Sequence, residues 1–383
     1  MDLVYGSALW FTSTRVTCHH LAERLALEGP TLFVESVGAR APRVHDWRRI
    51  ATRIGRSLRP LRQVGPQLWV FSPLPLPAYS GTGAAVNSRW VGRQVRTLLA
   101  LRRWTVDASW IFHPMGLGTA DQARARGTIY YCVDDYAANP GVDRTSVRRL
   151  EASLAGLANL TITTAEPLAV RLRPLARRVE VLPNVTDTDL FLGDVSAVRH
   201  PVLEALDALR RPRLGYLGNL AAYKIDVELI HEIARRRPQW SLALVGPMNR
   251  GDVRSGVTAL GSPPNVHWLG EVPHSVAPAV IERFDVALLP SAQHEVMQAS
   301  FPLKFFEYLL RGKPVVARPL PALEPFREWL DLADDAAGFV AAAERRLVGD
   351  SAELAARRRA FAARFAWTER IVGFEQLRRS VVG

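Results

Sequence analysis

The sequence predicts an α/β protein built from two Rossmann-like domains in series. With 383 residues, the chain is too long for a single compact core and has the length of two ordinary domains. Hydrophobic residues make up 48% of the chain and charged residues 22%, a balance typical of globular proteins. In each half, short apolar runs alternate with helical patterns, which is the signature of βαβ units around a parallel sheet.

The first half contains apolar runs that predict strands, with helical patterns between them. The strands are expected at Leu3–Tyr5, Thr31–Val34, Leu68–Phe71, Ser109–Phe112, Thr128–Val133, Leu160–Thr163 and Val179–Pro183. The clearest helical patterns fall at His19–Leu27, Asn87–Leu101 and Arg144–Ala158. The alternation stops near residue 185, so we expect the first domain to cover residues 1–185.

The same alternation begins again at residue 186 and predicts a second domain, 186–365. Its strands are expected at Arg213–Leu217, Ser241–Val245, Val266–Leu269, Asp285–Leu289 and Val315–Ala317. Its helices are expected at Asp226–Arg236, at 302–311 and along a stretch from Ser351 onward. Ligands of open parallel sheets bind outside the carboxyl ends of the strands, so two such domains facing each other would form a deep cleft.

The positive charge is concentrated in the first half. Of the net charge of +12, residues 1–185 contribute +11, from 24 Arg and 13 acidic residues. Residues 40–62 place eight arginines beside apolar residues at helical spacing, which favours contact with an anionic membrane. The alternative is an ordinary helix packed on the sheet with a solvated arginine face. Nucleic acid is not expected as a partner, because no recognised nucleic-acid module or interleaved aromatic residues accompany the charge.

Three features of the sequence bear on its compartment. No apolar run approaches the roughly 18 residues that cross a bilayer, and the N-terminus lacks the basic region of a signal peptide. Cys18 and Cys132 are the only cysteines, which indicates neither a disulfide framework nor a zinc site. We expect a cytoplasmic protein, peripheral on the inner face of the cell membrane if the basic segment binds there.

The sequence from Ser300 to Ala317 predicts a helix that leads directly into a buried strand. Ser300 is suited to cap the helix and Pro302 to its first turn. Lys304 and Glu307 are three residues apart and share a helical face near the N-terminus. A lysine there favours a phosphate, and a carboxylate one turn later accepts from sugar hydroxyls. The alternative is a surface Lys–Glu pair on an ordinary helix.

Other strand ends of the second domain carry residues suited to a nucleotide. They are Gly218, Asn219 and Lys224 after the first strand, Gly246 after the second and Glu271 after the third. Glycines let a diphosphate approach the backbone, a lysine neutralises it, and a base-binding loop is expected near Glu271. The alternative for each glycine is a tight turn. The spacing is neither G-x-G-x-x-G nor a P-loop, so neither a nicotinamide enzyme nor a standard NTPase is indicated.

In the first domain, Asp134 and Asp135 follow a predicted strand. A carboxylate at this place could accept a proton from an acceptor hydroxyl, with a pKa raised by its neighbour's charge; the alternative is a solvated loop or a helix cap. His113, after the preceding strand, and Trp10, near the N-terminus, are acceptor-side candidates. Residues 187–189 have the form of an Asp-x-Asp metal motif, but we interpret them as a linker, and no other cluster has metal-ligand spacing.

On these motifs the chain resembles the GT-B glycosyltransferases, specifically bacterial members similar to family 4 and to the teichuronic-acid-type transferases. Residues 183–187 look like their Pro-Asn-Gly-Val-Asp hinge, with Val185 in place of the glycine. Residues 218–224 look like their diphosphate loop, and residues 302–316 are the most specific match. The resemblance covers most of the second domain strongly and the first domain weakly.

The resemblance implies a nucleotide-sugar donor in the second domain and an acceptor in the first. The acceptor would be a glycan, a lipid-linked glycan of cell-surface polysaccharide assembly, or a small molecule. Lys224 and Lys304 would contact the diphosphate, and Glu307 the ribose or the sugar. The C-terminal helix, 366–383, would pack back on the first domain. GT-B enzymes generally need no bound metal, so no cofactor is expected.

One position separates the two stereochemical classes. Retaining family-4 enzymes have a Glu-x7-Glu motif that ends at the position of Glu307, but Ala299 stands eight residues earlier. This departure favours an inverting enzyme, in which Asp134, with Asp135 as the substitute candidate, would be the base. Two other functions stay open: a nucleotide-sugar epimerase on the same scaffold, and a non-catalytic partner of another transferase.

Overall fold

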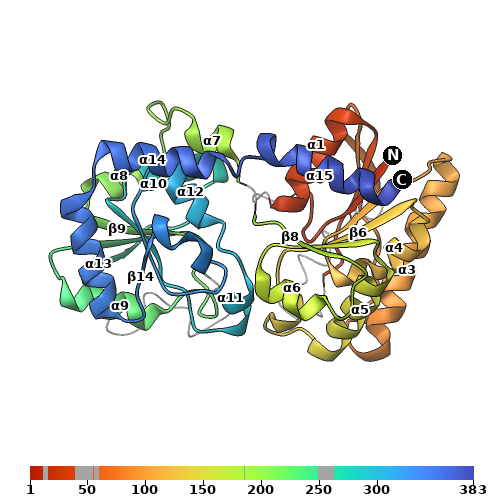
Figure 1. The fold of residues 1–383 in the computed structure, drawn as a ribbon, viewed down its shortest axis with the longest axis horizontal. Helices are drawn as coiled ribbons and strands as arrows, with labels where there is room; N and C mark the ends of the chain where they lie inside the picture. Colours follow the sequence, from red (N-terminus) through yellow and green to blue (C-terminus); the bar gives the residue numbers. More distant parts are fainter. Residues whose placement is uncertain (12–15, 39–54, 56–59, 185, 249–262) are drawn as a thin grey trace. The chain divides into compact units, whose positions relative to one another are not determined.

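The computed structural model describes residues 1–11, 16–38, 55, 60–184, 186–248 and 263–383. They form two compact units, and we describe each unit by itself. Unit 1 consists of Met1–Pro183 together with Ile371–Gly383, and unit 2 consists of Asn184–Arg370. Each unit has its own sheet with helices packed on it (Figure 1).

Unit 1 is built on an eight-stranded sheet in the order β3-β4-β2-β1-β5-β6-β7-β8. All neighbouring strands pair in parallel except β3, which runs antiparallel to β4 at one edge. The strands β1, β2, β5, β6 and β7 are buried at every position, which explains their continuous apolar runs. The strands are β1 Asp2–Tyr5, β2 Thr31–Val34, β3 Leu61–Gly65, β4 Leu68–Phe71, β5 Ala108–Ile111, β6 Gly127–Cys132, β7 Leu160–Thr163 and β8 Val179–Val181.

The helices of unit 1 connect these strands. They are α1 Thr17–Glu28, α3 Gly81–Arg102, α4 Leu117–Ala123, α5 Arg144–Leu157 and α6 Glu166–Leu172, with short 3₁₀ turns η2 Pro114–Gly116 and η3 Tyr136–Ala138. Helices α3 and α4 cross at two glycines, because a Cβ on Gly92 would lie 2.1 Å from the Gly118 oxygen. At the same crossing, Ser88 Oγ donates to the Met115 oxygen and accepts from the Gly118 N–H. This contact fixes α3 on α4.

Unit 2 has a six-stranded parallel sheet in the order β11-β10-β9-β12-β13-β14. Its strands are β9 Arg213–Leu217, β10 Ser241–Val245, β11 Val266–Trp268, β12 Val286–Leu289, β13 Val315–Ala317 and β14 Asp331–Leu332. Its helices are α7 Thr188–Leu192, α8 Pro201–Ala208, α9 Val227–Arg236, α10 Ala277–Glu282, α11 Glu295–Ala299, α12 Lys304–Leu310, α13 Ala336–Gly349 and α14 Ala352–Ala363, with 3₁₀ turns η4 His274–Val276 and η5 Glu324–Trp329.

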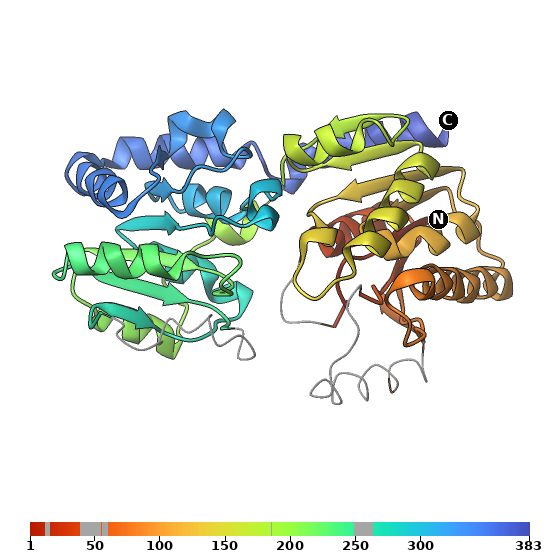
Figure 2. The ribbon, with the colours of Figure 1, turned by 90° about the horizontal axis from the view of Figure 1, so that it is seen from below.

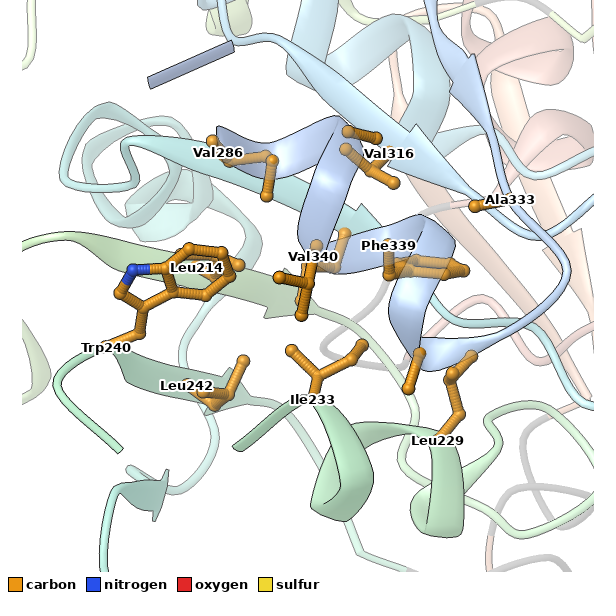
Figure 3. Packing of buried hydrophobic residues seen from close by; sticks show 14 of the residues in the cluster. Leu214, Leu229, Ile233, Trp240, Leu242, Val286, Val316, Ala333, Phe339 and Val340 are labelled. Carbon is orange, nitrogen blue, oxygen red and sulfur yellow. The ribbon is translucent and has the colours of Figure 1, made fainter. Parts of the chain in front are cut away.

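The core of unit 2 lies between its sheet and two helices. Leu214 and Val316 of the sheet pack against Ile233 of α9 and Phe339 of α13, all of them buried (Figure 3). Burying such side chains is worth roughly 1.5–3 kcal/mol each. The α9 pattern predicted from the sequence therefore reflects a real buried face.

The last helix, α15 Trp367–Val382, brings the end of the chain onto unit 1 (Figure 2). Phe374 is buried, and its ring lies 6.1 Å from the Trp110 ring and 5.7 Å from the Tyr131 ring, centre to centre. Arg378 Nε donates to both carboxylate oxygens of Asp2, at 2.9 and 3.0 Å. The C-terminal segment is thus an integral part of unit 1.

Four local expectations differ from the structure. Ser300 does not cap α12, because its Oγ donates to the Val296 oxygen at 2.6 Å and so belongs to the end of α11. The helical stretch expected from Ser351 onward divides into α14 and α15. The edge strands β3 and β14 were not expected. Most of the basic segment 40–62 lies outside the described residues; within it Gly55 is helical, whereas Leu61 and Arg62 belong to β3.

Candidate active site

The candidate donor site lies at the carboxyl ends of the central strands of unit 2. The sheet order places β10 and β11 on one side of β9, and β12, β13 and β14 on the other. The chain therefore changes direction across the sheet between β9 and β12, and open α/β sheets bind ligands outside such a switch point. The loop that begins at Gly218, directly after β9, lies at this place.

Glycines allow the strand ends to approach one another closely. Gly218 donates its N–H to the Val245 oxygen, and Gly246 donates to the Gly270 oxygen, both at 2.8 Å. A Cβ on Gly246, whose φ is 138°, would lie 2.0 Å from the Gly218 oxygen. No side chain larger than hydrogen fits there. The sequence-predicted Gly218 and Gly246 are thus brought into direct contact.

Lys304 reaches the same loop from the first residue of α12. A Cβ on Gly218 would lie 1.9 Å from Lys304 Cε and 2.7 Å from its Nζ, so the lysine side chain covers this glycine. Burial lowers the pKa of Lys304, and the positive charge of Lys224 lowers it further, while Glu307 opposes the change. Two ammonium groups therefore repel each other beside the glycine loop.

Lys224 is held at this place by contacts on both sides. Its N–H donates to the Ala221 oxygen at 2.8 Å, and its own oxygen accepts from the Ala292 N–H at 3.0 Å. The second bond ties the loop after β9 to the loop after β12. The side chain lies beside the Tyr223 ring, with Nζ 5.7 Å from the ring centre.

Glu307 is buried one turn further along α12. Burial raises the pKa of its carboxyl group, the charges of Lys304 and His274 lower it, and the charge of Asp187 raises it. His274 and Asp187 were not expected in this surrounding. Asp187 also caps α7 by accepting from the Leu190 N–H.

Tyr308 is a positioning residue that the sequence did not reveal. Its hydroxyl is buried and accepts from the Leu217 N–H at 2.9 Å, which fixes α12 to the last residue of β9. The neighbouring Tyr216 donates its hydroxyl to the Asn219 oxygen at 3.2 Å. The only sequence signal was an aromatic residue directly after Glu307.

Two other donor-side candidates have different surroundings. Asn219 Oδ1 accepts from the Ala221 N–H at 3.0 Å, so this side chain shapes the loop. Glu271 is exposed and follows Gly270, whose oxygen accepts from Gly246. The backbone of Glu271 therefore lies directly after the hydrogen bond between Gly246 and Gly270.

In unit 1, Asp134 and Asp135 occupy the loop after β6 but make different contacts. Asp135 is buried; its Oδ2 lies 2.5 Å from Arg148 Nη2, and its Oδ1 accepts from the Ala137 N–H. Asp134 is half-buried and accepts from the Asp135 N–H at 2.9 Å. Arg148 also binds the buried Glu151, which accepts from the Tyr130 hydroxyl. Asp135 is therefore anchored in an ion-pair network.

His113 and Trp10 are both buried. Burial lowers the pKa of His113 to about 3, and its Nδ1 accepts from the Met115 N–H. Its ring lies 4.4 Å from the ring of Tyr136, which follows Asp135, so His113 and the Asp134 loop meet at neighbouring strand ends. The Trp10 ring packs against Phe33, and the backbone N–H of Trp10 donates to Glu35 Oε1.

In the part of the chain that the structure describes, no group of three or more His, Cys, Asp or Glu side chains is arranged to hold a metal ion. No helix among these residues combines the length and apolar character needed to cross a membrane.

Comparison with known sequences links the second unit to a family. Residues 211–360 match the family described as "Glycosyl transferases group 1". A putative teichuronic acid biosynthesis glycosyltransferase, TuaH, from Bacillus subtilis (strain 168) is 32% identical over 176 residues, which are 44% of this chain and 43% of that protein. The 2-deoxystreptamine glucosyltransferase of Streptomyces kanamyceticus is 28% identical over 181 residues, 46% of this chain and 44% of that protein. The matched part spans less than half the length of these relatives.

Solved structures resemble the chain over almost its whole length. A sucrose-phosphate synthase from Thermosynechococcus elongatus has a TM-score of 0.75 and 16% identity, over 99% of this chain and 98% of that one. HepE from Anabaena, in complex with UDP and glucose, has a TM-score of 0.68 and 16% identity, over 98% of each chain. At such identity the likeness concerns the fold alone. Residues 211–360 are therefore similar to the group 1 glycosyl transferases, and the chain has the GT-B fold.

Proposed function

We propose that the protein transfers a sugar from a nucleoside-diphosphate sugar to an acceptor hydroxyl. The observation that carries this proposal is the ammonium group of Lys304, which covers Gly218 at the switch point of the unit 2 sheet. Burial lowers its pKa, the charge of Glu307 opposes this change and the charge of Lys224 adds to it, so the free site holds two cations close together. A bound diphosphate would offset their repulsion.

The same arrangement suits the chemistry of transfer. Negative charge develops on the diphosphate as the bond to the sugar breaks, and preorganised cations stabilise that charge most in a site shielded from water. The buried Glu307 carboxylate, next to Lys304, would accept from hydroxyls of the ribose or the sugar. With two lysines in this role, the donor requires no metal ion on this proposal. HepE, crystallised with UDP and glucose, supports this class of donor.

Unit 1 would bind the acceptor, and Asp134 is the base that we propose. Asp135 is buried and binds Arg148 and the Ala137 N–H; Asp134 is half-buried at the same strand end, where an acceptor can reach its carboxylate. The Asp134 carboxylate would take the proton of the acceptor hydroxyl. At the same time the hydroxyl oxygen would attack the anomeric carbon of the donor sugar, and the nucleoside diphosphate would leave. This attack from the face opposite the leaving group inverts the anomeric centre.

Asp134→Asn tests this assignment. We expect turnover to fall by about 10²- to 10⁴-fold, with donor affinity unchanged, because the donor contacts belong to unit 2. The readout is release of UDP from UDP-glucose and UDP-N-acetylglucosamine, with a bacterial lipid extract and free oligosaccharides as acceptors. Asp121→Asn, at an exposed position, is the control. Unchanged turnover of Asp134→Asn would remove this residue from the mechanism.

The acceptor is best supported as a glycan of cell-surface polysaccharide assembly. TuaH, named for teichuronic acid biosynthesis, supports this class, and the 2-deoxystreptamine transferase supports small-molecule acceptors as the second candidate. A lipid-linked glycan would bring the protein to the inner face of the membrane, where residues 40–62 would contribute positive charge. The relatives named above are glycosyltransferases, and none supports an epimerase or a non-catalytic partner.

A further inference from the structure

Positive charge without compensation extends well beyond residues 40–62. Residues 47–106 contain eleven arginines and no aspartate or glutamate. Five of these arginines lie on or directly after α3, at Arg89, Arg93, Arg96, Arg102 and Arg103. Among the described residues none of the five forms an ion pair, and Arg96 donates only to the Gln122 amide oxygen at 3.3 Å. Helix α9 of unit 2 differs, since Arg235 and Arg236 both pair with Glu232.

The α3 arginines lie on one face of the helix. Arg89, Arg93 and Arg96 are spaced i, i+4 and i+7, which places them in one row, and all three are exposed. The opposite face is buried against unit 1, where Val91, Gly92, Val95 and Leu99 face inward. Because α3 is fixed on α4 where Gly92 approaches Gly118, this row lies on a helix that is firmly held on unit 1; Figure 1 shows α3 beside α4.

Exposed apolar side chains run beside the arginine row. Val86, Trp90 and Leu101 are 50%, 38% and 79% exposed, and their helical positions form the adjacent stripe. Trp90 Nε1 donates to the Leu74 oxygen at 2.9 Å, and Gln94 binds both the N–H and the oxygen of Leu74. These bonds hold the 44% exposed Leu74 next to the stripe. The surface therefore combines unpaired arginines with apolar side chains and a tryptophan, a composition suited to the lipid–water boundary.

We propose that the exposed face of α3, together with Leu74, docks on an anionic lipid bilayer. Charge complementarity selects the partner: arginines near an anionic leaflet each strengthen binding about fivefold. The apolar stripe distinguishes a bilayer from nucleic acid, which offers no place for Val86, Leu74 or Leu101. This face is separate from the donor site and extends the proposed membrane contact to residues outside 40–62.

The test is co-sedimentation with vesicles of phosphatidylcholine, with and without phosphatidylglycerol, at about 0.1 and 0.5 M salt. For the full-length triple variant Arg89→Gln/Arg93→Gln/Arg96→Gln we expect a roughly 100-fold loss of partitioning onto the anionic vesicles. The control, Arg235→Gln/Arg236→Gln/Arg357→Gln, removes three exposed arginines from unit 2 and should leave partitioning within about threefold of wild type. Equal loss in both triple variants would overturn the proposal in favour of a net-charge effect.

A second variant, Val86→Ser/Leu101→Ser, keeps every arginine and should also weaken vesicle binding. The bilayer assignment is wrong if two results occur together: Val86→Ser/Leu101→Ser binds vesicles with wild-type affinity, and the wild type binds a DNA oligonucleotide as tightly as it binds vesicles. A thermal-shift titration with UDP separates the two proposals, because the triple α3 variant should keep the donor response of the wild type. Loss of vesicle binding with an intact UDP response is expected for this variant; vesicle binding equal to wild type would refute the docking surface alone.

Discussion

At the scale of single residues, Lys304 combines burial with a neighbouring positive charge. Among the described residues no carboxylate lies within ion-pair distance of it; burial and the charge of Lys224 lower its pKa, and the charge of Glu307 opposes them without cancelling them. A protein that needed only stability would gain by an apolar side chain at this position. Such residues, kept at a cost to stability, are typical of binding sites.

Lys304→Met should therefore stabilise the ligand-free protein. We expect the free energy of unfolding of unit 2 to increase by about 0.5–2 kcal/mol, measured by urea denaturation in the absence of nucleotides. Lys313→Met is the contrasting variant, because Lys313 Nζ donates to the Glu282 oxygen at 2.7 Å, and its loss should destabilise. A decrease in stability for Lys304→Met would mean that its ammonium group has a structural partner.

The difference between wild type and Lys304→Met should also depend on pH. The folded-state pKa of Lys304 lies below its ordinary value of 10.5. Between these two values the unfolded chain holds a proton that the folded protein lacks, so wild-type stability rises with pH in this window. The stability advantage of the variant should shrink as the pH rises toward 10.5, in urea melts at a series of alkaline pH values. An advantage that stays constant would contradict the lowered pKa.

At the scale of elements, the close contact of the loops after β9 and β10 shapes the candidate site. Gly246 is the position where this contact leaves no room for a side chain. The surrounding strands were predictable, because β9, β10 and β13 are fully buried and so appear as continuous apolar runs.

Gly246→Ala should displace the Gly218 loop and weaken donor binding at least about tenfold. The matched control is Gly38→Ala in unit 1, where φ is 74° and no atom lies within 4 Å of an added Cβ. Both variants strain the backbone, but only the first forces a clash. Titration calorimetry with the nucleoside diphosphate measures the affinity of each variant. Equal affinity of the two variants would mean that the contact between Gly246 and Gly218 does not shape the donor site.

Each feature that the sequence did not reveal has its own physical cause. The strand β3 lies at a sheet edge with exposed and half-buried side chains, so it lacks the apolar run that marks an inner strand. Ser300 donates its hydroxyl back to the Val296 oxygen and so belongs to the end of α11. The local sequence is equally compatible with Ser300 as the cap of α12, and so it did not reveal this arrangement. The proximity of His274 and Asp187 to Glu307 depends on tertiary packing between distant segments.

At the scale of the whole molecule, the end of the chain completes the core of unit 1. Phe374 is 1% exposed and packs on Trp110 and Tyr131, and Arg378 binds Asp2 of β1. The alternation of apolar runs and helical patterns predicted two sheets, and the family resemblance predicted a returning helix. It did not reveal which residues would anchor that helix.

Phe374→Ala should destabilise unit 1 by about 3–5 kcal/mol, because it leaves a cavity among buried aromatic rings. Hydrogen exchange followed by mass spectrometry should show faster exchange in β5 and β6, with β9 and β12 unchanged. Val372→Ala, at a 54% exposed position of the same helix, is the control. Faster exchange in both units would mean that the C-terminal segment stabilises more than unit 1.

On the proposed function, unit 2 binds a nucleoside diphosphate against Gly218 and Lys304. Titration calorimetry of UDP, ADP, GDP and dTDP into wild type, Lys304→Met and Lys313→Met tests this binding. We expect one diphosphate to bind the wild type and Lys313→Met, and Lys304→Met to lose most of this affinity. Equal affinity in Lys304→Met and wild type, or no binding of any diphosphate to the wild type, would contradict it.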